Sequence, residues 1–165
     1  MIIYEAAVSI PIIAMLAMTA MAVFLWGIKT YFMQIADGEL EQEVEIAFQE
    51  LLEDSMSAVR IEKMPGKQGY EIVKKNNPLK PQKPDKETFS VTYCLNEVDG
   101  VVKLVCGGVR APLTGNHALA PVDITDFAIN EDEHQPGVYH LRLTGKSGVT
   151  KHEYSLCSAV FVPAP

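Results

Sequence analysis

The stretch that decides the fold runs from Ala6 to Ile28 and reads AAVSIPIIAMLAMTAMAVFLWGI, 23 residues without a charged side chain. As a helix rising about 1.5 Å per residue it would extend roughly 35 Å, enough to cross a hydrocarbon core about 30 Å thick. A soluble core helix is seldom this apolar on every face. A cleavable secretory signal would have a basic region before it and a shorter apolar run. We therefore expect residues 1–28 to form a helix that spans a membrane or packs in an equally apolar place.

Two residues of this segment are unusual in an apolar helix. Pro11 has no N–H to donate to the carbonyl of Ala7, so we expect it to kink or locally open the helix. Glu5 places a carboxylate near the edge of the membrane segment, where a charge is costly. It is either a functional group with a partner or a side chain in the headgroup region, and its position alone leaves both open.

Residues 29–63 continue the helical pattern with a different composition. They carry nine acidic and three basic side chains, so the whole net charge of −7 for the 165 residues lies here and at Glu5. Most of the glutamates are expected to lie on a solvated face. Small and apolar side chains recur at three- and four-residue steps and form one stripe: Leu40, Val44, Ala47, Phe48, Leu51, Ser55, Ala58 and Val59. The lack of a basic excess excludes a nucleic-acid binder that neutralises phosphates.

The helix is predicted to end at Met64-Pro65-Gly66, because proline disfavours helix in the residue before it and glycine permits a reversal. Residues 64–87 are then expected to connect it to a β-rich region in 88–165. The run NNPLKPQKPDK at 76–86 contains three prolines, which is typical of an extended connector.

Beyond this connector the pattern changes to strands. Apolar and polar residues alternate from Phe89 to Leu95, Asp99-Gly100 is a type I′ turn signal, and residues 101–106 form the returning strand. Further strands are expected near 70–74, 123–130, 138–144 and 151–162, with Gly145–Gly148 turning the last pair. The predicted fold is α+β: a long N-terminal helix, transmembrane in its first half and amphipathic in its second, packed on a C-terminal antiparallel sheet. Because this sheet has a thin core alone, the stripe of the helix should complete it.

The hairpin also constrains the three cysteines. A two-residue turn pairs Val98 with Val101, which places Tyr93 opposite Cys106 and puts Cys94 on the other face. A Cys94–Cys106 disulfide is disfavoured, because the Cβ vectors would point apart. If the chain contains a disulfide, we expect it between Cys106 and Cys157. No CxxC and no pair of histidines at ligand spacing on one helix occur, so no metal site is expected.

The remaining acidic residues, histidines, serines and glycines fit ordinary structural roles better than catalytic or metal-binding ones. An acidic cluster beside predicted loops lacks EF-hand spacing, which favours solvated acids over calcium ligands: Asp123, Asp126, Glu131, Asp132 and Glu133. The histidines are best interpreted as surface or cross-strand residues: His117, His134, His140 and His152. No G-x-S-x-G occurs, and Gly107-Gly108 lacks the lysine of a phosphate loop. The sequence predicts neither an enzyme nor a bound cofactor.

The sequence Met1-Ile2-Ile3-Tyr4-Glu5, followed by AAVSIPIIAMLAM, an amphipathic helix and a C-terminal sheet, resembles the type IV pilin superfamily. The resemblance implies that a prepilin peptidase removes a basic leader ending in glycine and that the new first residue becomes an N-methylated amine. Met1 is then expected to be this mature end. Glu5 is expected to pair with the α-amino group of a neighbouring subunit, which would set the register of assembly.

The resemblance implies a structural role. The subunit would wait in the bacterial inner membrane and would be assembled by a machine driven by a cytoplasmic ATPase, alone or with other pilins. The product would be an extracellular or periplasmic filament, with its loops as a binding surface. The stretch from Leu51 to Ile61 is similar to larger minor pilins and J-type pseudopilins, and Glu5 with Pro11 is similar to tight-adherence pseudopilins. Major pilins more often carry a proline deeper in the helix, where this chain has Ala22, so all three kinds of subunit stay open.

A different class of protein also fits part of the sequence. A single-pass, membrane-anchored extracytoplasmic sensor or ligand-binding module would explain the apolar segment and the sheet. It would not explain Glu5, Pro11, or a helix that continues some 30 residues beyond the membrane. A short basic leader ending in glycine, encoded just upstream of Met1, would discriminate the two.

Overall fold

The computed structural model describes residues 2–66, 68–76, 87–107, 112–114 and 120–163, with side chains from residue 9 onward. In this part of the chain one helix, α1 (Ile2–Met56), is followed by seven strands. The chain divides into two compact units, residues 1–35 and residues 36–165. The predicted α+β fold, a long apolar N-terminal helix packed on antiparallel strands, is confirmed.

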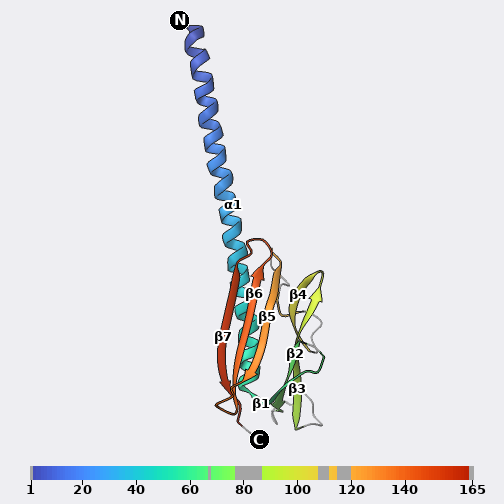
Figure 1. Ribbon diagram of the computed structural model, residues 1–165. Coiled ribbons are helices and arrows are strands. Elements are labelled where there is room, and N and C mark those ends of the chain that lie inside the picture. The colour runs from blue at the N-terminus through green and yellow to red at the C-terminus, as the bar shows by residue number, and fades with distance from the viewer. Residues whose placement is uncertain (1, 67, 77–86, 108–111, 115–119, 164–165) are drawn as a thin grey trace. The chain divides into compact units, whose positions relative to one another are not determined.

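The second unit contains two antiparallel sheets rather than the one that we expected from the sequence (Figure 1). The first sheet has the order β1 (Ala58–Lys63), β2 (Gly69–Lys75), β3 (Thr88–Val98) and β4 (Val101–Cys106). The second has the order β5 (Val122–Glu131), β6 (Val138–Ser147) and β7 (Glu153–Phe161). They meet where the amide of Val102 donates to Oδ1 of Asp123 at 2.9 Å.

The β3–β4 hairpin has the predicted turn and register. Asp99 and Gly100 both have positive φ angles, 55° and 76°, as a type I′ turn requires. Tyr93 lies opposite Cys106 and Leu95 opposite Leu104. Tyr93, Leu104 and Cys106 are buried, so this face of the hairpin contributes to the core.

The end of the helix differs from the prediction. α1 ends at Met56, and residues 58–63 form β1 instead of the last helical turns. The Ser57 amide still donates to the carbonyl of Glu53, after which the chain pairs with β2. Met64-Pro65-Gly66 therefore turns β1 into β2, with Gly66 at a φ of 79°, and does not end the helix. Residues 69–75 form β2, which confirms the strand expected near 70–74 within the connector at 64–87.

The last hairpin is also displaced from its expected turn. Gly145 lies inside β6, which continues to Ser147. Its position has a packing reason, because a Cβ on Gly145 would lie 2.5 Å from Cγ2 of Val44 and 3.1 Å from Cδ1 of Leu40. A side chain there would push α1 away from the sheet.

The apolar stripe of α1 supplies one side of the core of the second unit, as predicted. Leu40, Val44, Ala47 and Leu51 have no exposed surface. They form one cluster with side chains of both sheets, including Ile72 on β2 and Leu143 on β6. Figure 1 shows this part of α1 alongside β6 and β7. The sheets therefore do not have a complete core without residues 36–56.

Candidate functional site

The candidate assembly surface is the helix of the first unit. The large apolar side chains of residues 10–33 are exposed by 37% to 69%: Ile10, Ile12, Ile13, Met15, Leu16, Met18, Met21, Val23, Phe24, Leu25, Trp26, Ile28, Tyr31, Phe32 and Met33. None of the most apolar 18-residue stretch is buried. The described part of the chain thus contains one helix that is long and apolar enough to cross a membrane.

Polar side chains in this helix bond to its own backbone. The Thr19 hydroxyl donates to the carbonyl of Leu16 at 2.9 Å, and the Thr30 hydroxyl to that of Trp26 at 3.0 Å. Such bonds satisfy a hydroxyl without water. They leave the surface of the helix apolar, which suits either lipid or a neighbouring helix.

The predicted assembly residues are only partly described by the structure. Met1 and the side chain of Glu5 lie outside the described residues, although residue 5 is helical. Pro11 lies inside α1, and the helix continues through it without interruption. The described backbone therefore does not open at Pro11, and the kink expected there stays a prediction. The missing Pro11 N–H removes one bond of the ladder, and the bonds on either side maintain the helix.

The acidic half of α1 makes more contacts than the sequence indicates. The hydroxyl of Thr150, in the turn between β6 and β7, donates to the Asp37 carboxylate on α1. The Ala120 amide donates to Oε2 of Glu39 at 3.2 Å, and the Tyr154 hydroxyl to Oε1 of Glu45 at 3.1 Å. Most glutamates of this part of the chain are exposed, as expected, Glu45 among them. The three carboxylates above also attach the helix to the segments around the second sheet.

A buried polar network joins the end of α1 to the first sheet. Nζ of Lys74 lies 2.6 Å from Oδ1 of Asp54, and the Tyr93 hydroxyl donates to Oδ2 of Asp54 at 2.9 Å. The Lys74 and Asp54 side chains are about four-fifths buried, and the Lys74 ammonium also lies 5.8 Å from the centre of the Phe89 ring. Burial and the hydrogen bond to Asp54 raise the pKa of Tyr93, so the phenol stays protonated. This arrangement fixes the helix but exposes no reactive group.

The cysteines do not form the expected disulfide. Cys94, Cys106 and Cys157 are all free thiols. Cys106 is buried on β4, whereas Cys157 is exposed on β7, so the pair lies on different sheets and in opposite environments. The hairpin register could not show that β4 and β7 belong to separate sheets.

The acidic cluster of the sequence is dispersed in the structure. Asp123 accepts from Val102 on β4, and Asp126 lies 3.6 Å from Arg142. Oδ1 of Asp132 accepts the amides of His134 and Gln135 inside the β5–β6 turn. Within the described residues, no group of three or more His, Cys, Asp or Glu side chains is placed to hold a metal ion.

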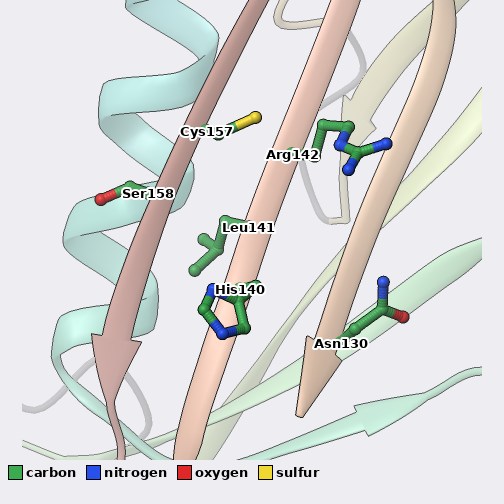
Figure 2. A pocket seen from close by; sticks show the side chains of 6 residues that line it. All are labelled: Asn130, His140, Leu141, Arg142, Cys157 and Ser158. Atoms are coloured by element: carbon green, nitrogen blue, oxygen red, sulfur yellow. The ribbon is translucent and has the colours of Figure 1, made fainter. Parts of the chain in front are cut away.

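A shallow hollow lies on the outer face of the second sheet (Figure 2). Its walls are Asn130, His140, Leu141, Arg142, Cys157 and Ser158. Arg142 and Cys157 are paired in register on β6 and β7. Nε2 of His140 is 3.0 Å from Oδ2 of Asp132, so this ring is already held by the turn. Only the β5–β6–β7 register brings these residues together, so no local pattern in the sequence indicates this hollow.

No protein-family model, curated protein or solved structure matches this chain. The fold and the surfaces described above therefore carry the functional argument.

Proposed function

We propose that this chain is a structural subunit of a type IV pilus-like filament and that it polymerises through its N-terminal helix. One observation carries the proposal: residues 10–33 expose large apolar side chains on every side of a helix whose later turns form the core of a folded domain. Glu5 would pair with the N-terminal amine of a neighbouring subunit, and prepilin peptidase and a pilus assembly machine would be the processing partners.

Assembly replaces lipid around the helix with other helices. Lipid tails are as apolar as leucine, so this exchange gains little from the hydrophobic effect and depends on close packing and polar pairs. Close packing alone leaves the axial register of two apolar helices poorly determined. A buried carboxylate that needs one cationic partner would determine it, because a mispaired charge in this environment is costly.

The apolar helix also suggests where the subunit lies before and after assembly. Before assembly, the apolar helix would hold the subunit in the bacterial inner membrane, with residues 36–165 outside the cytoplasm. After assembly, the filament would be extracellular or periplasmic. An anchored sensor would also need a membrane helix, but it would not need that helix to continue as the central element of its folded domain. The continuity of α1 from residue 2 to Met56 therefore favours the filament subunit.

The test is a Glu5→Ala variant expressed in the native host beside its assembly genes. We expect the variant in the membrane fraction at the normal level and absent from sheared surface filaments viewed by immunogold electron microscopy. Glu41→Ala, which removes an exposed carboxylate from the second half of α1, is the matched control and should assemble normally.

Normal filaments from Glu5→Ala would contradict the pairing role of Glu5. Wild-type chain that is never found in filaments, together with a start codon at Met1 and no upstream leader, would instead support the membrane-anchored module. A short basic leader ending in glycine just upstream of Met1 would support the filament subunit.

A further inference from the structure

A groove follows one edge of β5, between the two sheets of the second unit. Two hollows of about 410 and 220 Å³ share Lys63, Tyr70 and Asn130 in their walls. Together they are lined by each successive residue of β5 from Thr125 to Glu131. The side chains of a strand alternate between its two faces, so a groove on one face would be lined only by every second residue. This groove is lined by consecutive residues and therefore lies at the edge of the strand.

The floor of the groove is aromatic. The rings of Tyr70 on β2 and Phe127 on β5 meet edge to face, with centroids 5.3 Å apart. Both side chains are buried. This contact joins the two sheets at the floor of the groove.

The backbone of β5 has hydrogen-bonding groups on this edge. The Asp132 amide donates to the carbonyl of Val138 at 2.8 Å, which continues the β5–β6 ladder. In an antiparallel pair, alternate residues bond the neighbouring strand and the residues between them point away from it. Counting back from Asp132, the N–H and C=O groups of Ile129 and Phe127 point away from β6 and toward the groove.

In the part of the chain that the structure describes, this edge of β5 is open, whereas the edge of β4 is covered. The Leu104 amide donates to the Thr114 hydroxyl at 3.2 Å, and the Leu113 amide to the Leu104 carbonyl at 2.8 Å. Among the described residues, no strand pairs with β5 on the side away from β6. Exposed strand edges attract other strands, and proteins usually block them. An unblocked edge beside a groove is therefore suited to binding an added strand.

The walls of the groove carry more acid than base. Glu131 and Glu133 line the larger hollow and Asp126 the smaller one, whereas Lys63 is the basic residue common to both. Asp126 also lies near the guanidinium of Arg142, and Glu131 accepts a hydrogen bond from the amide of Gly137. The exposed Glu133 contacts neither Arg142 nor the Gly137 amide. A ligand that follows this wall therefore meets a negative field.

We propose that the groove binds an extended, basic polypeptide segment of another protein, which adds a strand to β5. The backbone of the segment would pair with the N–H and C=O groups of Phe127 and Ile129, while its basic side chains would face Asp126, Glu131 and Glu133. The proposal does not rest on the filament function, because every group in it lies between residues 61 and 139.

The test uses the full chain in detergent micelles and a fluorescent octapeptide of alternating lysine and valine. We expect this peptide to bind and two control peptides to bind at least about tenfold more weakly. One control has glutamate in place of lysine. The other keeps the lysine and valine side chains but has every backbone nitrogen methylated, so it keeps the charge and cannot donate to β5.

Two charge reversals in the groove should have opposite effects on binding of the lysine–valine peptide. We expect Glu133→Lys to weaken it and Lys63→Glu to strengthen it, each about fivefold, as for exposed charge pairs. Glu87→Lys, the same reversal at an exposed residue just before β3, is the matched control and should leave the affinity unchanged.

Amide hydrogen exchange reports directly on the edge of β5. Bound peptide should slow exchange at Ile129, whose N–H points into the groove, more than at Ala128, whose N–H already bonds β6. The proposal is overturned if the lysine–valine peptide does not bind, if the methylated peptide binds equally well, or if exchange at Ile129 is unchanged.

Discussion

The hydroxyl of Tyr93 donates a hydrogen bond of 2.9 Å to Oδ2 of Asp54, 39 residues earlier in the chain, in the last turns of α1. The other oxygen of the same carboxylate lies 2.6 Å from Nζ of Lys74. Tyr93 has no exposed surface, so its hydroxyl has little access to water as an alternative partner. One side chain of the helix thus satisfies donors from β2 and β3.

Asp54→Ala should therefore destabilise the fold more than an ordinary loss of a surface charge. It leaves the Tyr93 hydroxyl and the Lys74 ammonium without their acceptor, and we expect the free energy of unfolding to fall by about 3 kcal/mol. Urea denaturation of the full chain in detergent, followed by circular dichroism, measures this change. Glu53→Ala is the control at an exposed neighbour and should cost less than about 0.5 kcal/mol. Equal effects of the two substitutions would show that the network contributes no stability.

Gly145→Ala tests how closely the helix approaches β6. The added Cβ would lie 2.5 Å from Val44 and 3.1 Å from Leu40, so α1 or β6 must shift, at a cost of about 1 to 3 kcal/mol. Gly38→Ala is the matched control, because a Cβ there meets no atom within 4 Å. Since alanine favours a helix over glycine, Gly38→Ala should stabilise the chain by up to about 1 kcal/mol. Thermal unfolding of the two variants should therefore shift in opposite directions.

The thiols should differ in their reaction with iodoacetamide. Burial, followed by the nearby Glu50 carboxylate, raises the pKa of Cys106, so this thiol is both inaccessible and protonated at neutral pH. Cys157 is exposed and should be alkylated first, whereas Cys106 should react only on unfolding. Mass spectrometry of the denatured chain without reductant should count three alkylated cysteines. A count of one would show that two of the three cysteines form a disulfide.

The hydrogen bonds of Asp132 in the β5–β6 turn should make the free energy of unfolding sensitive to acid. The hydrogen bond with His140, followed by the amide of His134, lowers the pKa of Asp132 below its ordinary value of 3.8. The unfolded chain therefore takes up this proton at a higher pH than the folded chain does. The stabilisation is complete above the unfolded value and is lost as the pH falls through the folded value.

Asp132→Asn should accordingly lose less stability than the wild type when both are acidified through this range. Urea denaturation at a series of pH values measures the difference, and an NMR titration of the Asp132 carboxyl gives its midpoint directly. A midpoint at or above 3.8 would contradict the proposed hydrogen bonding.

Local chemistry made some parts of this fold predictable from the sequence. Asp99-Gly100 determined the β3–β4 turn and its register, since few residues accept positive φ at two successive positions. The stripe from Leu40 to Ser55 identified the buried face of α1, because its spacing matches the helical period. The apolar run before it identified the exposed helix from composition alone.

Other features depend on partners that are distant in the sequence. Residues 58–63 fit both the helical stripe and a strand, and pairing with β2 decides between them. The contacts of Asp37 and Glu45 reach side chains 113 and 109 residues away, which no local pattern reveals. The β5 groove exists only because two sheets meet, so its residues from β1, β2 and β5 show no common motif. Pairing of Glu5 needs a second chain and so remains a prediction.

The position of α1 within the second unit has a mechanical consequence. Residues 36–56 run alongside the strands and supply core side chains over their length, with Asp37 and Asp54 bonded near the two ends. Tension applied along the helix would therefore load these contacts in shear, all at once, rather than peel them apart one after another. Whatever pulls on the apolar segment pulls on the centre of the domain, and the domain should yield only at high force and as a whole.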